Sequence, residues 1–79
     1  MDNKATTDTT LASYLIIEGY KLVGINYSKP RFEYTFDRLI TESADKYISG
    51  RALVDPSDLI RVNKKLLRII GKRIQWGED

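Results

Sequence analysis

Residues 31–36 alternate between polar and apolar side chains without interruption. In a strand, Phe32, Tyr34 and Phe36 would lie on one face and the residues between them on the other. Such alternation is typical of an antiparallel sheet that buries one face and leaves the other in water. This segment therefore needs a neighbouring strand and helices that cover its aromatic face.

The neighbouring strand is predicted over residues 20–27, where Val23, Ile25 and Tyr27 alternate. The residues between the two strands, around 28–30, have the composition of a turn, so the two strands are expected to form an antiparallel hairpin. We expect the buried face of this hairpin to pack against the last helix and to consist of Val23, Ile25, Phe32, Tyr34 and Phe36.

Two helices are predicted from apolar residues at helical spacing on either side of the hairpin. The first covers about residues 8–18, with Thr7 as N-cap and Gly19 as its left-handed end. The second covers about residues 38–49, with Asp37 as cap.

The clearest local signal is the start of the third helix, predicted over residues 56–74. Asp55 is placed as N-cap, Pro56 at the first helical position and Asp58 in the first turn, where a negative charge is favourable. The fold class is therefore α+β, one small domain in the order α-β-β-α-α. We expect the domain to cover residues 7–76, after a disordered stretch 1–6 and before a tail 77–79.

The absence of histidine and cysteine restricts the chemistry of this chain of 79 residues. It excludes disulfides, a Ser-His-Asp triad and a zinc site of the usual ligands. The acidic residues are better explained as caps and solvated positions than as a catalytic pair. We expect a protein that is not an enzyme and that uses no cofactor and no metal. The sequence has no apolar run that suggests a secretory signal or a membrane span, so a cytoplasmic location is expected.

Charge is distributed unevenly along the chain. Residues 56–75 hold six basic residues and one acidic residue, a net charge of +5, so the rest carries −3 of the total of +2. On a helical wheel most of these cations share one stripe. A one-signed stripe can follow a nucleic-acid backbone, and it can also be an ordinary solvated face. The candidate contacts for a nucleic acid or an acidic partner are Arg61, Lys64, Lys65, Arg68 and Lys72.

The apolar arc of the third helix covers about half of the wheel, more than one core requires. Either the first helix covers the extra flank or a second copy of the chain does. Because the hairpin edges would also be open, a homodimer is predicted, with a monomer as the alternative. Trp76 is either a partner anchor or a lid over the core. The candidate interface residues are Leu59, Ile60, Leu67, Ile74 and Trp76.

Several short motifs resemble a family of small uncharacterised proteins of bacteriophages, prophages and bacteria. The motifs are TTDTTLASYLIIEGYKLVGI, RFEYTFD and YISGRALVDPSDLIRVNKKLLR, which together extend over about residues 6–70. They are structural, and they carry no site residues. The resemblance implies a phage or mobile-element setting, with action in the host cytoplasm.

The sequence thus favours a non-enzymatic binding protein of the regulator or inhibitor type. A host or viral protein is the preferred partner, and no membrane is involved. The first alternative is a nucleic-acid-binding protein that uses the basic stripe. The second alternative is a virion or assembly component.

Overall fold

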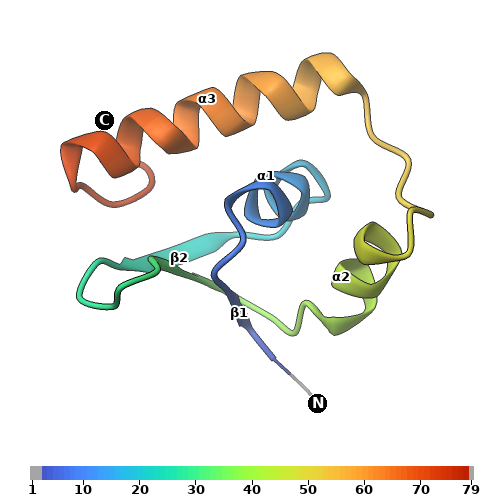
Figure 1. The fold of residues 1–79 in the computed structure, drawn as a ribbon, viewed down its shortest axis with the longest axis horizontal. Helices are drawn as coiled ribbons and strands as arrows, with labels where there is room; N and C mark the ends of the chain where they lie inside the picture. Colours follow the sequence, from blue (N-terminus) through green and yellow to red (C-terminus); the bar gives the residue numbers. More distant parts are fainter. Residues whose placement is uncertain (1–2, 79) are drawn as a thin grey trace.

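The computed structural model, which describes residues 3–78, has one three-stranded antiparallel sheet and three helices. The sheet order is β1-β3-β2, and in Figure 1 α1 lies between the sheet and α3, with α2 on the other side of α1. This arrangement confirms the predicted α+β class, with helices packed on a hairpin. The elements are β1 (Ala5–Thr6), α1 (Thr9–Ile17), β2 (Leu22–Asn26), β3 (Glu33–Phe36), α2 (Thr41–Ile48) and α3 (Pro56–Lys72).

The strand β1 was not predicted. Ala5 and Thr6 pair with Thr35 and Tyr34 of β3, and the carbonyl of Lys4 accepts a hydrogen bond from the Phe36 amide at 2.8 Å. The prediction of a disordered stretch 1–6 is therefore wrong for its described residues, while Met1 and Asp2 lie outside them. A strand of two residues has no periodicity to detect, and backbone bonds hold it in place.

The buried face of β2 differs from the prediction at Val23, while Ile25 is buried as predicted. A β-bulge lies between Leu22 and Gly24, so Val23 points outward and is 62% exposed, while Leu22 and Ile25 are buried. The expectation that Val23 belongs to the core is wrong, because a bulge inserts one extra residue and resets the alternation. On β3 the prediction is confirmed, since Tyr34 and Phe36 are both buried.

Two of the predicted caps differ from the observed ones. The N-cap of α1 is Asp8, whose carboxylate accepts from the Leu11 amide at 3.0 Å, and not Thr7. Asp37 does not cap α2, which starts four residues later. Its Oδ1 atom accepts instead from the Lys21 amide at 3.1 Å and so ties the ends of the hairpin together.

The start of α3 is as predicted. Asp55 is the N-cap and accepts from the Ser57 amide at 2.8 Å, and Pro56 occupies the first turn. The helix ends at Lys72, and Arg73 follows in the left-handed conformation with φ of 56°. The chain then turns back, so the expected end near residue 74 is slightly too late.

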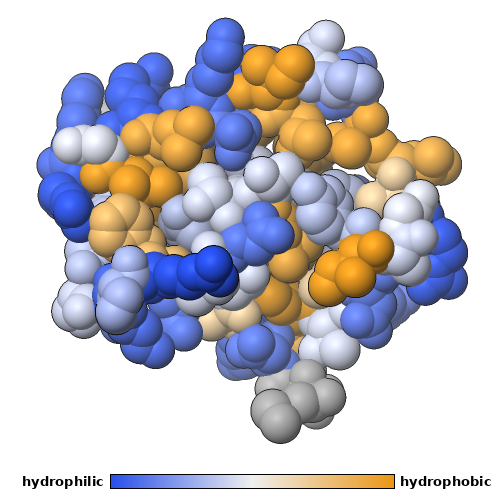
Figure 2. Space-filling view, in the orientation of Figure 1, coloured by the Kyte–Doolittle hydropathy of each residue, from blue (hydrophilic) through white to orange (hydrophobic). Residues whose placement is uncertain are grey.

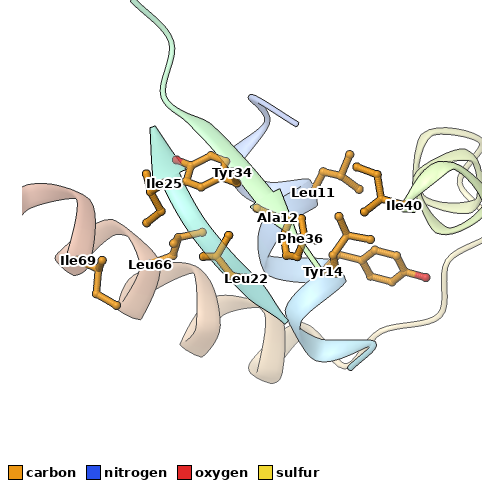
Figure 3. Packing of buried hydrophobic residues seen from close by; sticks show 11 residues of the cluster. Leu11, Ala12, Tyr14, Leu22, Ile25, Tyr34, Phe36, Ile40, Leu66 and Ile69 are labelled. Atoms are coloured by element: carbon orange, nitrogen blue, oxygen red, sulfur yellow. The ribbon is translucent and has the colours of Figure 1, made fainter. Parts of the chain in front are cut away.

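The core lies between the inner face of the sheet, α1 and α3 (Figure 3). Leu66 and Ile69 of α3 are buried together with side chains of all three layers, whereas Phe32 is only partly buried against this cluster. The hairpin and α3 thus contribute to one core, as predicted, but the main packing partner of α3 is α1 and not the hairpin. The buried apolar residues are Leu11, Ala12, Tyr14, Leu15, Leu22, Ile25, Tyr34, Phe36, Ile40, Leu66 and Ile69.

Candidate functional site on the outer side of helix α3

The five predicted basic contacts lie on the side of α3 that faces away from the core. Arg61, Lys64, Arg68 and Lys72 are exposed, and Lys65 lies half-buried at the border. Part of this side forms a shallow, open depression of about 600 Å³, lined by Ser57, Ile60, Arg61, Lys64, Lys65 and Arg68. The structure thus brings the predicted residues together on one side of the helix. Their side chains differ in the contacts that they make.

Arg61 is paired within its own helix. Its Nη2 atom lies 2.9 Å from Oδ1 of Asp58, one turn earlier. The pair is well exposed, so it adds little stability. It nevertheless places a negative charge beside the stripe, which the sequence pattern had suggested to be free of acids.

The side chain of Lys65 lines the edge of the depression, and its ammonium group is directed toward Trp76. Its Nζ atom lies 4.7 Å from the centre of the Trp76 ring, a cation–π contact. Trp76 is itself partly buried against the core. Of the two functions considered for Trp76, the lid over the core describes this arrangement, and neither Trp76 nor Lys65 is placed as a free contact residue.

The other three cations project from the helix at intervals of one turn. Lys64, Arg68 and Lys72 follow one another at i, i+4 and i+8 and are exposed. Between Asn3 and Glu78, no Asp or Glu side chain forms an ion pair with Lys64 or Lys72. A row of positive charge therefore faces the solvent.

Two large aliphatic side chains accompany these cations. Ile60 is 56% exposed and Leu67 is 51% exposed, and the two lie at i and i+7 on the same side, beside Lys64. They belong to the apolar flank for which the sequence predicted a cover. Figure 2 shows blue and orange side chains mixed along the upper edge of the molecule, where α3 runs. We call the set Ile60, Lys64, Leu67, Arg68 and Lys72 the outer α3 face.

The remaining predicted interface residues are not part of this face. Leu59 and Ile74 are partly buried and pack against the core of their own molecule. The α1 helix covers the inner flank of α3 and leaves Ile60 and Leu67 uncovered. Of the five predicted interface residues, Ile60 and Leu67 are the two that the structure leaves more than half exposed. The homodimer remains a prediction.

Arg73 is the residue that the sequence analysis missed. Its guanidinium carbon lies 4.6 Å from the centre of the Phe32 ring and 5.4 Å from that of Tyr27. The two rings also meet each other edge to face, at 5.1 Å. The left-handed turn at the end of α3 directs Arg73 back onto the hairpin, and no periodic signal in the sequence marks that turn.

The pKa values that differ clearly from their ordinary values belong to tyrosine hydroxyl groups. Burial, with the hydrogen bond to Glu18, raises the pKa of Tyr14 to about 12, and burial raises the pKa of Tyr34 and of Tyr47 above the ordinary value of 10.0. These hydroxyls stay protonated at neutral pH. Among residues 3–78, no group of three or more acidic side chains could hold a metal ion. No helix in the described part of the chain is long and apolar enough to cross a bilayer.

The family suggested by the sequence motifs remains a prediction. No protein-family model, curated protein or solved structure matches this chain.

Proposed function

We propose that this chain is a non-enzymatic binding protein and that the outer α3 face docks a partner protein whose surface is both acidic and apolar. One observation carries the proposal: Ile60 and Leu67 are each more than half exposed within a row of outward cations. Protein interfaces combine apolar anchors with charged residues at the rim, and arginine is enriched among them. The outer α3 face has this composition.

Two contacts favour a protein over a nucleic acid as the partner. Arg61 is neutralised in part by Asp58, and Lys65 lies on Trp76, so at least two of the five cations already have partners within the chain. Exposed aliphatic side chains such as Leu67 gain nothing from phosphate groups, whereas an apolar protein surface would cover them.

A nucleic acid is the second candidate, and the spacing of Lys64, Arg68 and Lys72 favours it. Steps of four residues place these cations about 6 Å apart along the helix axis. Stacking of bases on the hairpin has little support, because Arg73 covers Tyr27 and Phe32, and Tyr34 is buried. This candidate would therefore act through the phosphate backbone alone.

The biological setting that we propose is a phage or mobile element, with the partner in the host cytoplasm and an effect of the regulator or inhibitor type. This part rests on the resemblance of the sequence motifs. A virion or assembly component is the third candidate function, and it rests on the same resemblance.

The test is an affinity capture from bacterial lysate in which two double variants divide the face into its apolar and cationic parts. Ile60→Ser with Leu67→Ser removes the aliphatic groups, and Lys64→Gln with Arg68→Gln removes two charges. We expect wild type to retain a protein after nuclease treatment, and we expect each double variant to lose it.

Matched controls change the same residue types elsewhere on the surface. Val23→Ser removes an aliphatic side chain that is 62% exposed on β2, and Lys21→Gln with Lys46→Gln removes two exposed charges. Both controls should bind like wild type. Loss of the bound protein with nuclease would favour the nucleic-acid function. Binding that survives in both outer α3 variants would show that the partner docks elsewhere.

A further inference from the structure

The β2 strand is an edge of the sheet and lacks two of the features that usually protect edges from pairing. Within residues 3–78 its only strand neighbour is β3. Its five residues, Leu22–Asn26, include no charged residue and no proline, the side chains that natural edges use against unwanted pairing. The bulge at Val23 hinders pairing with another strand at one end of β2. The middle of the strand is protected by a different contact.

The side chain of Gln75 makes this contact. Its Nε2 atom donates to the Ile25 carbonyl at 3.0 Å, and its Oε1 atom accepts from the Ile25 amide at 2.7 Å. In an antiparallel sheet the N–H and C=O of one residue point to the same side, and a hydrogen-bonded pair exchanges both bonds. One carboxamide therefore makes the two bonds that a residue of a neighbouring strand would make.

The segment that carries Gln75 is held against β2 by further contacts. The Tyr27 hydroxyl donates to the Ile74 carbonyl at 2.6 Å, and within the segment itself the backbone N–H of Gln75 donates to Oε1 of Glu78 at 2.6 Å. An open hollow of about 590 Å³ runs along this edge, lined by Val23, Gly24, Ile25, Asn26, Tyr27, Ser28, Thr35 and Gln75. The edge is thus accessible except where Gln75 lies.

We propose that the β2 edge is a pairing surface for the β2 strand of a second copy of this chain, and that Gln75 keeps it closed. Antiparallel pairing about a twofold axis at Ile25 would let each Ile25 amide donate to the Ile25 carbonyl of the other copy. These two bonds replace those of Gln75 one for one. Within the strand the same register sets Gly24 opposite Asn26, neither of which is charged, and the two lysines that it sets opposite each other, Lys21 and Lys29, lie outside Leu22–Asn26. This surface is separate from the outer α3 face, so its test is independent of the proposed function.

Replacement of Gln75 by leucine keeps the size of the side chain and removes both hydrogen bonds. In dilute solution we expect the Ile25 amide to exchange at least about tenfold faster than in wild type, as the loss of two hydrogen bonds implies. At high concentration the sedimentation coefficient should rise over a range in which wild type does not change. The protection of the Ile25 amide should return with the rise in mass. Gln75→Asn, one methylene shorter and unable to reach both groups, should behave in the same way.

Gln75→Glu adds a reversible version of the test. Above the usual pKa of a glutamate, about 4.3, the carboxylate cannot donate to the Ile25 carbonyl, and below it the neutral acid can donate and accept. We expect this variant to associate at neutral pH and to dissociate in acid, with wild type unchanged over the same range. Protection of amides in α1 and α3 shows that each variant stays folded. Folded variants that remain monomeric at every concentration, or that associate without protection of Ile25, would overturn the proposal.

Discussion

Tyr14 is a buried residue of α1, and its hydroxyl donates to Oε1 of Glu18 at 2.8 Å. Burial is the main reason that its pKa rises from the ordinary 10.0 to about 12. The unfolded chain can ionise this phenol from about pH 10, whereas the folded chain resists ionisation. The contribution of Tyr14 to stability is therefore fully present below pH 10 and is lost as the pH rises toward 12.

Tyr14→Phe tests this shift. We expect the free energy of unfolding of wild type to fall between pH 10 and pH 12, by at most about 1.4 kcal/mol per pH unit for this one proton. The variant should show a shallower fall, because it has no proton to lose at this position. Denaturant unfolding at a series of pH values measures both profiles. Identical slopes would mean that Tyr14 titrates normally in the folded chain.

Ser13 is the buried polar side chain between α1 and α3. Its hydroxyl lies 3.0 Å from the Thr9 carbonyl and 3.1 Å from Oδ1 of Asn63. One hydroxyl proton serves both acceptors, so the contact to Asn63 is shared with the helix backbone. It joins the two helices through a polar pair inside an apolar contact.

A double-mutant cycle measures that polar pair. Ser13→Ala should destabilise the fold by about 1 kcal/mol, the usual net value of one buried hydrogen bond. Asn63→Ala should show a coupling with Ser13→Ala of about 0.5 kcal/mol or more, because the two side chains are in contact. Equilibrium urea unfolding of the four proteins gives this energy. Strict additivity would show that the helices do not interact through this pair.

At the scale of elements, two neighbouring leucines of α3 lie on opposite sides of the helix, one in the core and one facing the solvent. Leu66 is fully buried in the core, and Leu67 is 51% exposed on the outer α3 face. Their side chains are identical, so the orientation of the helix alone decides what each one contributes.

Replacement of each leucine by alanine distinguishes a residue that stabilises the core from a residue that binds the partner. Leu66→Ala should cost about 2–5 kcal/mol, as is usual for a cavity in a core, and Leu67→Ala about 0.5 kcal/mol or less. Thermal and urea unfolding provide the measurement. If the proposed function is correct, Leu67→Ala weakens partner binding while the fold stays intact. Similar losses of stability for the two variants would show that α3 is rotated relative to the structure described here.

At the scale of the whole molecule, the salt dependence of binding distinguishes a nucleic-acid partner from a protein partner. If Lys64, Arg68 and Lys72 contact phosphates, the slope of log affinity against log salt on duplex DNA is about −2.7, and contacts by all five cations would give about −4.5. Neighbouring residues offer a matched pair. Lys64→Gln should flatten the slope by about one unit, whereas Lys65→Gln should leave it unchanged, because Lys65 lies on Trp76.

This salt dependence can be measured by fluorescence anisotropy with a labelled duplex. Duplex binding with either of these slopes would favour the nucleic-acid function, and an equal effect of Lys65→Gln would show that Lys65 contacts phosphates as well. The same charges bear on the predicted homodimer. A twofold contact between two outer α3 faces would bring Lys64 and Arg68 near their copies, an unfavourable arrangement for like charges.

The sequence by itself determined the local features of this protein. The Asp55–Pro56 start of α3, the aromatic face of β3 and the left-handed end of α1 at Gly19 depend on residues close in the chain, and all three are present. The basic residues of α3 were also found by spacing, because helical periodicity fixes which side chains share a side.

Tertiary structure decided the rest, because those features depend on contacts between distant residues. The pairing of β1 with β3, the bulge that turns Val23 outward and the closure of β2 by Gln75 each require a partner that no local pattern reveals. The same holds for the candidate site. Periodicity grouped Lys65 with Lys64, and only packing directed Lys65 onto Trp76 and left Ile60 and Leu67 exposed beside the remaining cations.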